Sequence, residues 1–268
     1  MINIIVCVKQ VPDPEAPVSS FKIDPEAKRA ISGNGIPPVL NPFDENALEA
    51  ALRIKDAQPA RITVISMGQR LARPVLQKTL AVGADELILL EDETFDSFDS
   101  YFTAYVIAAA IKKIGTYDLI LCGREAADSD AGQVGPGMAE ILDIPGITIA
   151  QKVDVIDGQV KVERIITEGY LDGYEVIEAP MPALVTASNE IGELRSTTVM
   201  ALLEARKKKV TIWNSQDLGL DASFPSERSS MLKLFIPVRE VNGELVTGDS
   251  PRQAGENLAL KLKEADLF

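Results

Sequence analysis

The sequence predicts an α/β protein: a doubly wound, mostly parallel sheet with an antiparallel extension and a C-terminal arm. Three observations predict this fold. Short β-branched runs alternate with longer helical patterns in the first half, strand-like segments with turn signals follow from Ile147, and the part after Asn214 is polar and weakly periodic. With 268 residues, 46% of them hydrophobic, the chain is long enough to bury a core of its own.

Four apolar runs in the first half have the composition of buried parallel strands, because none alternates between apolar and polar residues. They span residues 2–8, 61–66, 86–90 and 117–122. Apolar residues at helical spacing predict helices at 44–57, 70–83 and 97–115, and a fourth helix that begins near Gly135. This alternation predicts right-handed crossovers and a ligand site at the carboxyl ends of the strands.

The second half has a different pattern. Strand-like segments lie at 147–156, 159–169, 174–180 and 183–187, with turn signals such as Asp157-Gly158 between them. Together they predict an antiparallel ribbon or sheet extension. A loop and a short helix are expected within 189–209, and a last helix within 250–267. We therefore expect a domain of residues 1–213 and an arm of residues 214–268.

Composition excludes several classes of function. The chain has 27 Lys and Arg against 40 Asp and Glu, a net charge of -13, so we expect no nucleic-acid partner. It has no histidine, which excludes His-based nucleophile systems and His-ligated metals, and we expect neither catalytic side chains nor a metal site. Cys7 and Cys122 lie in apolar runs and are expected to be buried thiols. Without a signal sequence or an apolar run of about 20 residues, we expect no membrane span and a cytoplasmic location.

The loop at 123–145 is the main candidate site, because it follows a buried strand and opens a helix. It contains Gly132, Gly135 and Gly137. Free N–H groups and the helix dipole favour an anion at such a position, which predicts a phosphate cradle. The order Gly-x-x-Gly-x-Gly is neither the dinucleotide fingerprint nor a P-loop. A helix start capped by Asp128 or Asp130, with no ligand, is the open alternative.

Three further segments are expected at the same edge of the sheet, where strands end. They are Cys7-Val8-Lys9, Asn41-Pro42-Phe43-Asp44 and Ser66-Met67-Gly68. The second one also fits a complete helix start, with Asn41 as the cap and Pro42 in the first helical position, which requires no ligand. The convergence of strand ends nevertheless predicts a crevice here.

These residues resemble the beta subunit of electron-transfer flavoproteins. The matching motifs are VCVKQVPD at 6–13, NPFDENALEAA at 41–51 and DSDAGQVGP at 128–136. Residues 162–164, 168–169, 175–177 and 182–186 are similar to the signature of that family, with departures at Thr167 and in a longer turn around 170–174. The resemblance covers residues 1–220.

The resemblance implies a heterodimer with an alpha subunit that holds one FAD, with the arm of this chain packing on that subunit. It also implies that the crevice binds an adenine nucleotide. The residues implied are Cys7, Lys9, Asn41, Asp44, Met67, Asp128, Asp130, Ala131, Gly132, Gln133, Val134, Gly135 and Pro136. The segment at 188–200 resembles the part that docks a partner dehydrogenase, and Ile191 and Leu194 are its expected exposed anchors.

Two branches of the family differ in the nucleotide. In one branch, AMP is structural and the complex shuttles electrons from acyl-CoA dehydrogenases. In the other, a second FAD takes electrons from NADH and bifurcates them toward a dehydrogenase and a low-potential acceptor such as ferredoxin or flavodoxin. The start at 9–13 and the Gln133–Pro136 stretch are more similar to the second branch, although Ser129 and the Ala131-Gly132 pair depart from it. We therefore expect FAD, with AMP as the alternative. A stand-alone adenosine-nucleotide-binding domain is a more distant alternative.

Overall fold

The computed structural model describes residues 1–26, 28–32, 36–95, 99–168, 171–220, 229, 231–237 and 243–267. The chain divides into two compact units, residues 1–233 and residues 234–268. The predicted arm of residues 214–268 begins within the first unit. Its residues 221–228, 230, 238–242 and 268, like residues 169–170 of the signature stretch, lie outside the described residues.

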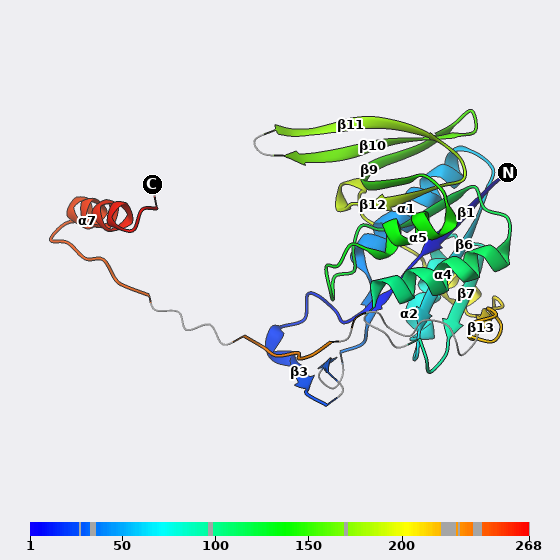
Figure 1. The fold of residues 1–268 in the computed structure, drawn as a ribbon, viewed down its shortest axis with the longest axis horizontal. Helices are drawn as coiled ribbons and strands as arrows, with labels where there is room; N and C mark the ends of the chain where they lie inside the picture. Colours follow the sequence, from blue (N-terminus) through cyan, green and yellow to red (C-terminus); the bar gives the residue numbers. More distant parts are fainter. Residues whose placement is uncertain are drawn as a thin grey trace. The chain divides into compact units, whose positions relative to one another are not determined.

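A sheet of nine described strands forms the centre of the first unit, in the order β11-β10-β9-β12-β8-β1-β6-β7-β13 (Figure 1). The parallel strands are β1 (Ile2–Cys7), β6 (Ala60–Gly68), β7 (Glu86–Glu91), β8 (Leu119–Gly123), β12 (Ala183–Ala187) and β13 (Thr211–Trp213). The antiparallel extension is β9 (Gly146–Ile156), β10 (Gln159–Glu168) and β11 (Leu171–Pro180). The predicted mostly parallel sheet with an antiparallel extension is confirmed.

One predicted strand belongs to a different part of the sheet. The sequence places residues 183–187 in the antiparallel extension, and this is wrong: they form β12, which pairs in parallel with both β8 and β9. The register places Thr186 beside Cys122 of β8, which in turn lies beside Cys7 of β1. The β12 segment is buried throughout, as a central parallel strand must be. The carboxyl end of β12 therefore places Thr186 at the edge of the sheet where a ligand is predicted.

Helices cover both faces of the parallel strands. Ile4 and Val6 of β1 share a core with α1 (Pro42–Ala57), whereas Ile5 and Cys7 share a second core with α4 (Ser100–Ile114) and α5 (Val134–Leu142). This alternation is the doubly wound arrangement expected from the sequence. The predicted helix at 70–83 is instead two short helices, α2 (Arg73–Leu76) and α3 (Lys78–Val82).

The remaining described elements are short. Strands β2 (Gln10–Val11) and β5 (Val39–Leu40) pair with each other, as do β3 (Phe21–Asp24) and β4 (Arg29–Ser32). The 3-10 helices η1 (Val18–Ser20) and η2 (Asn189–Ile191) and the helix α6 (Val199–Ala205) complete the first unit, and α7 (Pro251–Glu264) lies in the second. Among the described residues, the helices are all too short or too polar to span a membrane.

Candidate functional site

The predicted crevice lies at the carboxyl ends of β12, β8, β1 and β6, which are neighbours in the sheet. Cys7 ends β1 and is 6% exposed, and Met67, near the end of β6, is half-buried. In a doubly wound sheet, this edge is where ligands bind. The structure thus brings the predicted strand-end residues to one edge.

Asp44, in the first turn of α1, connects two of these strand ends. Its Oδ2 accepts a hydrogen bond from the Lys9 backbone N–H at 2.7 Å, and its Oδ1 accepts one from the Gly123 N–H at 2.8 Å. Burial raises the pKa of Asp44 to about 7, although these two N–H groups oppose the shift. The side chain is therefore a buried crosslink between the chain after β1 and the end of β8.

Asn41 occupies the predicted position before α1, but its side chain does not cap the helix. Its Nδ2 donates to the Glu125 carbonyl at 2.8 Å, and its Oδ1 accepts from the Ala127 N–H at 3.0 Å. Asn41 is 1% exposed, so these bonds are shielded from water. A helix start alone therefore does not account for this residue, because its side chain holds the loop that follows β8.

The ion pair between Lys9 and Asp128 joins the same loop to the end of β1. Lys9 Nζ lies 2.6 Å from Asp128 Oδ1, and the two side chains are 46% and 27% exposed. Asp128 therefore binds a lysine and does not cap α5. The alternative in which Asp128 caps the helix and no ligand is needed is not supported. Lys9 places a positive charge beside the glycine-containing loop.

The start of α5 fits an anion. Gln133 holds the N-cap position, and among the described residues no side chain caps the helix. Asp130 and Gly132 have left-handed φ angles of 48° and 62°, which turn the loop into the helix. The uncapped N–H groups of the first turn can therefore bind a negatively charged ligand. The predicted site residues of this loop that are exposed to solvent are Asp128, Asp130, Ala131, Gly132, Gln133 and Pro136, while Val134 is half-buried.

Gly135 has a different role from the one that its spacing suggests. A Cβ at this position would lie 2.7 Å from Thr186 Cγ2 and 3.0 Å from Cys122 Sγ. The glycine is buried and lets α5 pack closely on β8 and β12. A larger residue would therefore disturb the packing of the helix as well as any bound ligand.

A cavity of about 290 Å³ borders the other side of the loop. It is lined by Arg124, Glu125, Gly132, Thr148, Ile149 and Thr186. Of these residues, only Gly132 was predicted from the sequence. Arg124 follows the end of one strand and Thr186 lies near the end of another. Their positions in the sequence could therefore have predicted both as site residues. Arg124 also stacks on Phe43, with its guanidinium carbon 4.6 Å from the ring centroid.

Ile149, in this cavity wall, has an unusual backbone. Its φ angle is 60°, which is strained for a β-branched residue. Its N–H donates to Thr186 Oγ1 at 3.0 Å, where the pairing of β9 with β12 shifts register. Strained residues of this kind are concentrated at functional sites. The bulge in β9 therefore shapes one wall of the cavity.

Three buried groups, one hydroxyl and two thiols, test whether the crevice suits a polar ligand. Among the described residues, Ser66 Oγ is a buried polar atom with no hydrogen-bond partner. An unpaired buried hydroxyl is costly, so a polar ligand atom at this edge would be favourable. Cys7 and Cys122 are both free and buried, as predicted, and burial raises the pKa of each thiol well above its usual range. The crevice thus offers hydrogen-bonding and cationic groups for binding, but no reactive thiolate.

The predicted anchors of the segment at 188–200 lie elsewhere than expected. We expected Ile191 to be exposed, and this is wrong: it is 4% exposed and packs in the core beside α1. Leu194 is half-buried against the same core. The reason is that η2 and the turn after it fold back on α1. The exposed apolar residues are instead Val199 at 73% and Met200 at 66%.

Comparisons with known proteins give a consistent result. The family model named electron transfer flavoprotein domain matches residues 30–218. The caffeyl-CoA reductase-Etf complex subunit CarD of Acetobacterium woodii is 38% identical over 271 residues, 100% of each chain. The electron transfer flavoprotein subunit beta of Clostridium acetobutylicum is 40% identical over 265 residues, 98% of each chain. Protein FixA of Azorhizobium caulinodans is 35% identical over 82% of this chain and 78% of its own.

Proposed function

Because the chain belongs to the electron transfer flavoprotein family, we propose that it is the beta subunit of a heterodimer and binds a second FAD in the strand-end crevice. On this proposal the heterodimer takes a hydride, two electrons and one proton, from NADH. One electron goes to the alpha-subunit FAD and a partner dehydrogenase, and the other goes to a low-potential acceptor such as ferredoxin or flavodoxin.

The observation that carries this proposal is the uncapped start of α5 beside a lysine, at the end of four neighbouring strands. Free N–H groups and a nearby cation suit a pyrophosphate. Asn41 and Asp44 hold the surrounding backbone in place, so the cradle is largely preformed. A bound FAD would supply the hydride and electron chemistry, while the residues of this chain bind and orient it.

We favour FAD over AMP because the loop also borders the cavity of about 290 Å³ lined by Arg124, Thr148 and Thr186. Pockets that bind small molecules measure roughly 300–1,000 Å³, so this cavity can hold part of a nucleotide beyond its phosphates. Arg124, which is ion-paired with Glu125 at 2.9 Å, adds a guanidinium group to its wall, and Thr186 adds a hydroxyl. FAD, which has a second ring system, has more atoms to place beyond the cradle than AMP has.

Cofactor counting tests the proposal. The heterodimer is purified, denatured and extracted, and FAD and AMP are quantified per mole of complex. We expect two FAD and no AMP. One FAD with one AMP would overturn the FAD assignment and support the alternative, a subunit with structural AMP that shuttles electrons from acyl-CoA-type dehydrogenases. Thr148→Phe, which fills the cavity, should leave only the alpha-subunit FAD, whereas Thr148→Ala, the matched control, should retain both.

The proposed partner is an acyl-CoA dehydrogenase or a related flavin dehydrogenase. We propose that it docks on the segment at 188–200 and on the helix α6, which begins at the end of this segment. Val199 and Met200 are exposed here, and Leu203 is 44% exposed. An exposed apolar side chain at the centre of a contact supplies much of its binding energy. These residues replace Ile191 and Leu194 as the proposed anchors.

The second unit is proposed to bind the alpha subunit. Helix α7 has no buried residue, and Leu258 and Leu260 are 46% and 60% exposed. A helix with exposed leucines and little core of its own gains stability by packing on another protein. Limited proteolysis should cleave residues 234–268 faster in the free chain than in the heterodimer. Equal cleavage rates would contradict this role.

A further inference from the structure

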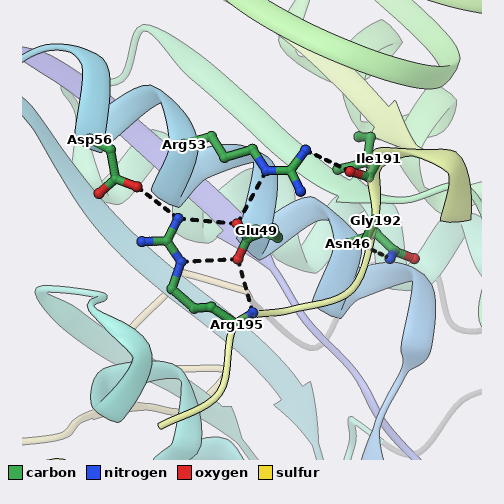
Figure 2. Close-up of polar contacts among 7 residues, drawn as sticks. All are labelled: Asn46, Glu49, Arg53, Asp56, Ile191, Gly192 and Arg195. Atoms are coloured by element: carbon green, nitrogen blue, oxygen red, sulfur yellow. Dashed lines mark hydrogen bonds and ion pairs between the residues drawn. The ribbon is translucent and has the colours of Figure 1, made fainter.

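Residues 192–198, which lead to α6, are in neither helix nor strand. Side chains of α1 nevertheless hold the first part of this stretch through hydrogen bonds (Figure 2). Asn46 Nδ2 donates to the Gly192 carbonyl at 2.7 Å, and Arg53 Nη1 donates to the Ile191 carbonyl at 2.7 Å. Asn46 and Arg53 lie seven residues apart in α1, so they project from one side of the helix. These two side chains hold the backbone of the turn at 191–192.

Glu49 lies between them and makes the densest set of contacts (Figure 2). It accepts hydrogen bonds from the Arg195 backbone N–H at 3.0 Å, from Arg195 Nε at 3.1 Å and from Arg195 Nη2 at 3.1 Å. Arg53 Nε donates to the same carboxylate at 3.2 Å. Glu49 therefore binds both the main chain and the side chain of Arg195.

Burial makes this contact specific. The Glu49 side chain is only 7% exposed, and the Arg195 side chain is 33% exposed. Arg195 Nη2 also donates to Asp56 Oδ2 at 2.8 Å, so the guanidinium has two carboxylates in reach. A bidentate pair between a buried carboxylate and an arginine fixes direction as well as distance. Arg195 is thereby held in one orientation along α1.

Only three residues separate Arg195 from Val199. Within them, Thr197 Oγ1 donates to the Ala81 carbonyl at 3.2 Å, and Thr198 caps α6 by accepting from the Ala201 N–H at 3.1 Å. The start of α6 is therefore held by Arg195, by the Thr197 bond to Ala81 and by the packing of α6 against α3. Release of Arg195 would remove one of these anchors, four residues before the exposed Val199.

We propose that Glu49 is a positioning residue for partner docking. By holding Arg195 it keeps the start of α6 in the orientation in which Val199 and Met200 meet the dehydrogenase, so that ordering of this segment does not oppose binding. This inference rests on the proposed docking function of the segment. Glu49 itself is too deeply buried to touch the partner, and it acts only through Arg195.

The test uses the heterodimer with its flavins, NADH as reductant and ferredoxin as the low-potential acceptor. The probe is a purified short-chain acyl-CoA dehydrogenase, with its enoyl-CoA substrate as the terminal electron acceptor. We expect Glu49→Gln to raise the KM for the dehydrogenase about five- to tenfold, the scale of coupling between contacting residues, with kcat and NADH-driven flavin reduction unchanged. Lys55→Gln is the matched control. It lies on the same helix and breaks the ion pair with Asp85 without touching the 191–195 turn, so KM should not change.

A double-mutant cycle separates positioning from simple stabilisation. If Glu49 acts through Val199, then Glu49→Gln combined with Val199→Ala should raise KM no more than Val199→Ala alone. Independent, multiplied effects on KM would overturn the inference, as would a lower melting temperature of Glu49→Gln with an unchanged KM. If Val199→Ala itself has no effect on KM, the proposed docking surface is wrong. An effect of Val199→Ala without one of Glu49→Gln refutes only the positioning role.

Discussion

Helix α1 carries two buried carboxylates that are held by different kinds of partner. Asp44, in the first turn, is 6% exposed and accepts hydrogen bonds from the backbone N–H groups of Lys9 and Gly123. Glu49, five residues later, is 5% exposed and binds the guanidinium groups of Arg53 and Arg195. The exposed fractions of the two residues are thus nearly the same, but Asp44 lies deeper in the protein, and the partners differ.

The two pKa values shift in opposite directions. Burial raises the pKa of Asp44 to about 7, and its neutral N–H partners only partly oppose this. Burial would also raise the pKa of Glu49, but the hydrogen bonds and charges of Arg195 and Arg53 outweigh it, and the pKa lies below the ordinary value. Helix α1 therefore tolerates a protonated carboxyl group at Asp44, near the crevice. At Glu49, beside the docking segment, it requires a charged one.

The largest expected effect is that of Glu49→Leu, which keeps the size of the side chain but removes its charge. It leaves the Arg195 N–H without its acceptor and the guanidinium groups of Arg53 and Arg195 without their buried carboxylate. We expect a loss of about 2–4 kcal/mol in the free energy of unfolding, measured by urea denaturation. A loss below about 1 kcal/mol would show that the charged partners are dispensable and would remove the contrast with Asp44.

The same variant has a defined pH dependence. Because the folded-state pKa of Glu49 is lowered, its contribution to stability is present above the ordinary glutamate value of 4.5 and is lost as pH falls through the folded pKa. The stability difference between wild type and Glu49→Leu should therefore shrink below about pH 4.5. A difference that stays constant down to pH 3 would contradict the ion-pair explanation.

The next effect is that of Asp44→Asn. The amide has one acceptor oxygen, whereas both oxygens of the carboxyl group can accept whether or not it is protonated, so one of the N–H groups of Lys9 and Gly123 loses its partner, at a cost of about 1–3 kcal/mol near pH 4. A raised folded pKa means that the wild type loses stability as pH rises from about 4 to about 7, while the amide does not titrate. The difference between the two proteins should therefore decrease over that range, the reverse of the Glu49 trend. Unfolding curves at several pH values measure it.

The sequence predicts much of the fold because apolar patterns are local. The runs around β1, β6, β7 and β8 identify these strands, and the helical spacing identifies α1 and α4. The direction of β12 could not be predicted, because a short apolar run looks the same in a parallel and an antiparallel pair. The break between α2 and α3 was also missed, since it lies inside one continuous helical pattern around Gln77.

The site was predictable where residues follow strand ends, and less so where contacts are long-range. Cys7, Asn41, Asp44 and Met67 lie at the expected edge, but the side-chain bonds of Asn41 to the loop 84 and 86 residues away could not be foreseen. Glu49 was missed because a glutamate among alanines and leucines is typical of an exposed helix face. Its partner Arg195 is 146 residues away. The bulge at Ile149 likewise has no signal in composition.

The smallest effect on stability should come from Lys9→Gln, which extends the comparison to an exposed pair at the crevice. Lys9 and Asp128 are 2.6 Å apart, but with 46% and 27% exposure water screens their attraction. We expect a change in unfolding free energy below about 0.5 kcal/mol. If Lys9 faces a bound phosphate, the same substitution should still weaken nucleotide binding about three- to tenfold, measured by titrating the nucleotide-free heterodimer with FAD.

Lys161→Gln is the matched control for that measurement, because it breaks an exposed ion pair with Glu178 on the β10–β11 ribbon, away from the crevice. It should leave both stability and nucleotide binding near wild type. If Lys9→Gln lowers the free energy of unfolding by more than about 1 kcal/mol, its ion pair stabilises the fold as strongly as the buried contacts of Glu49 do. Unchanged FAD binding would mean that Lys9 only positions the loop through Asp128. Weaker binding at unchanged stability would separate two kinds of charge around α1: the exposed Lys9 at the crevice serves the ligand, whereas the buried Glu49 stabilises the fold and holds Arg195 for the proposed docking.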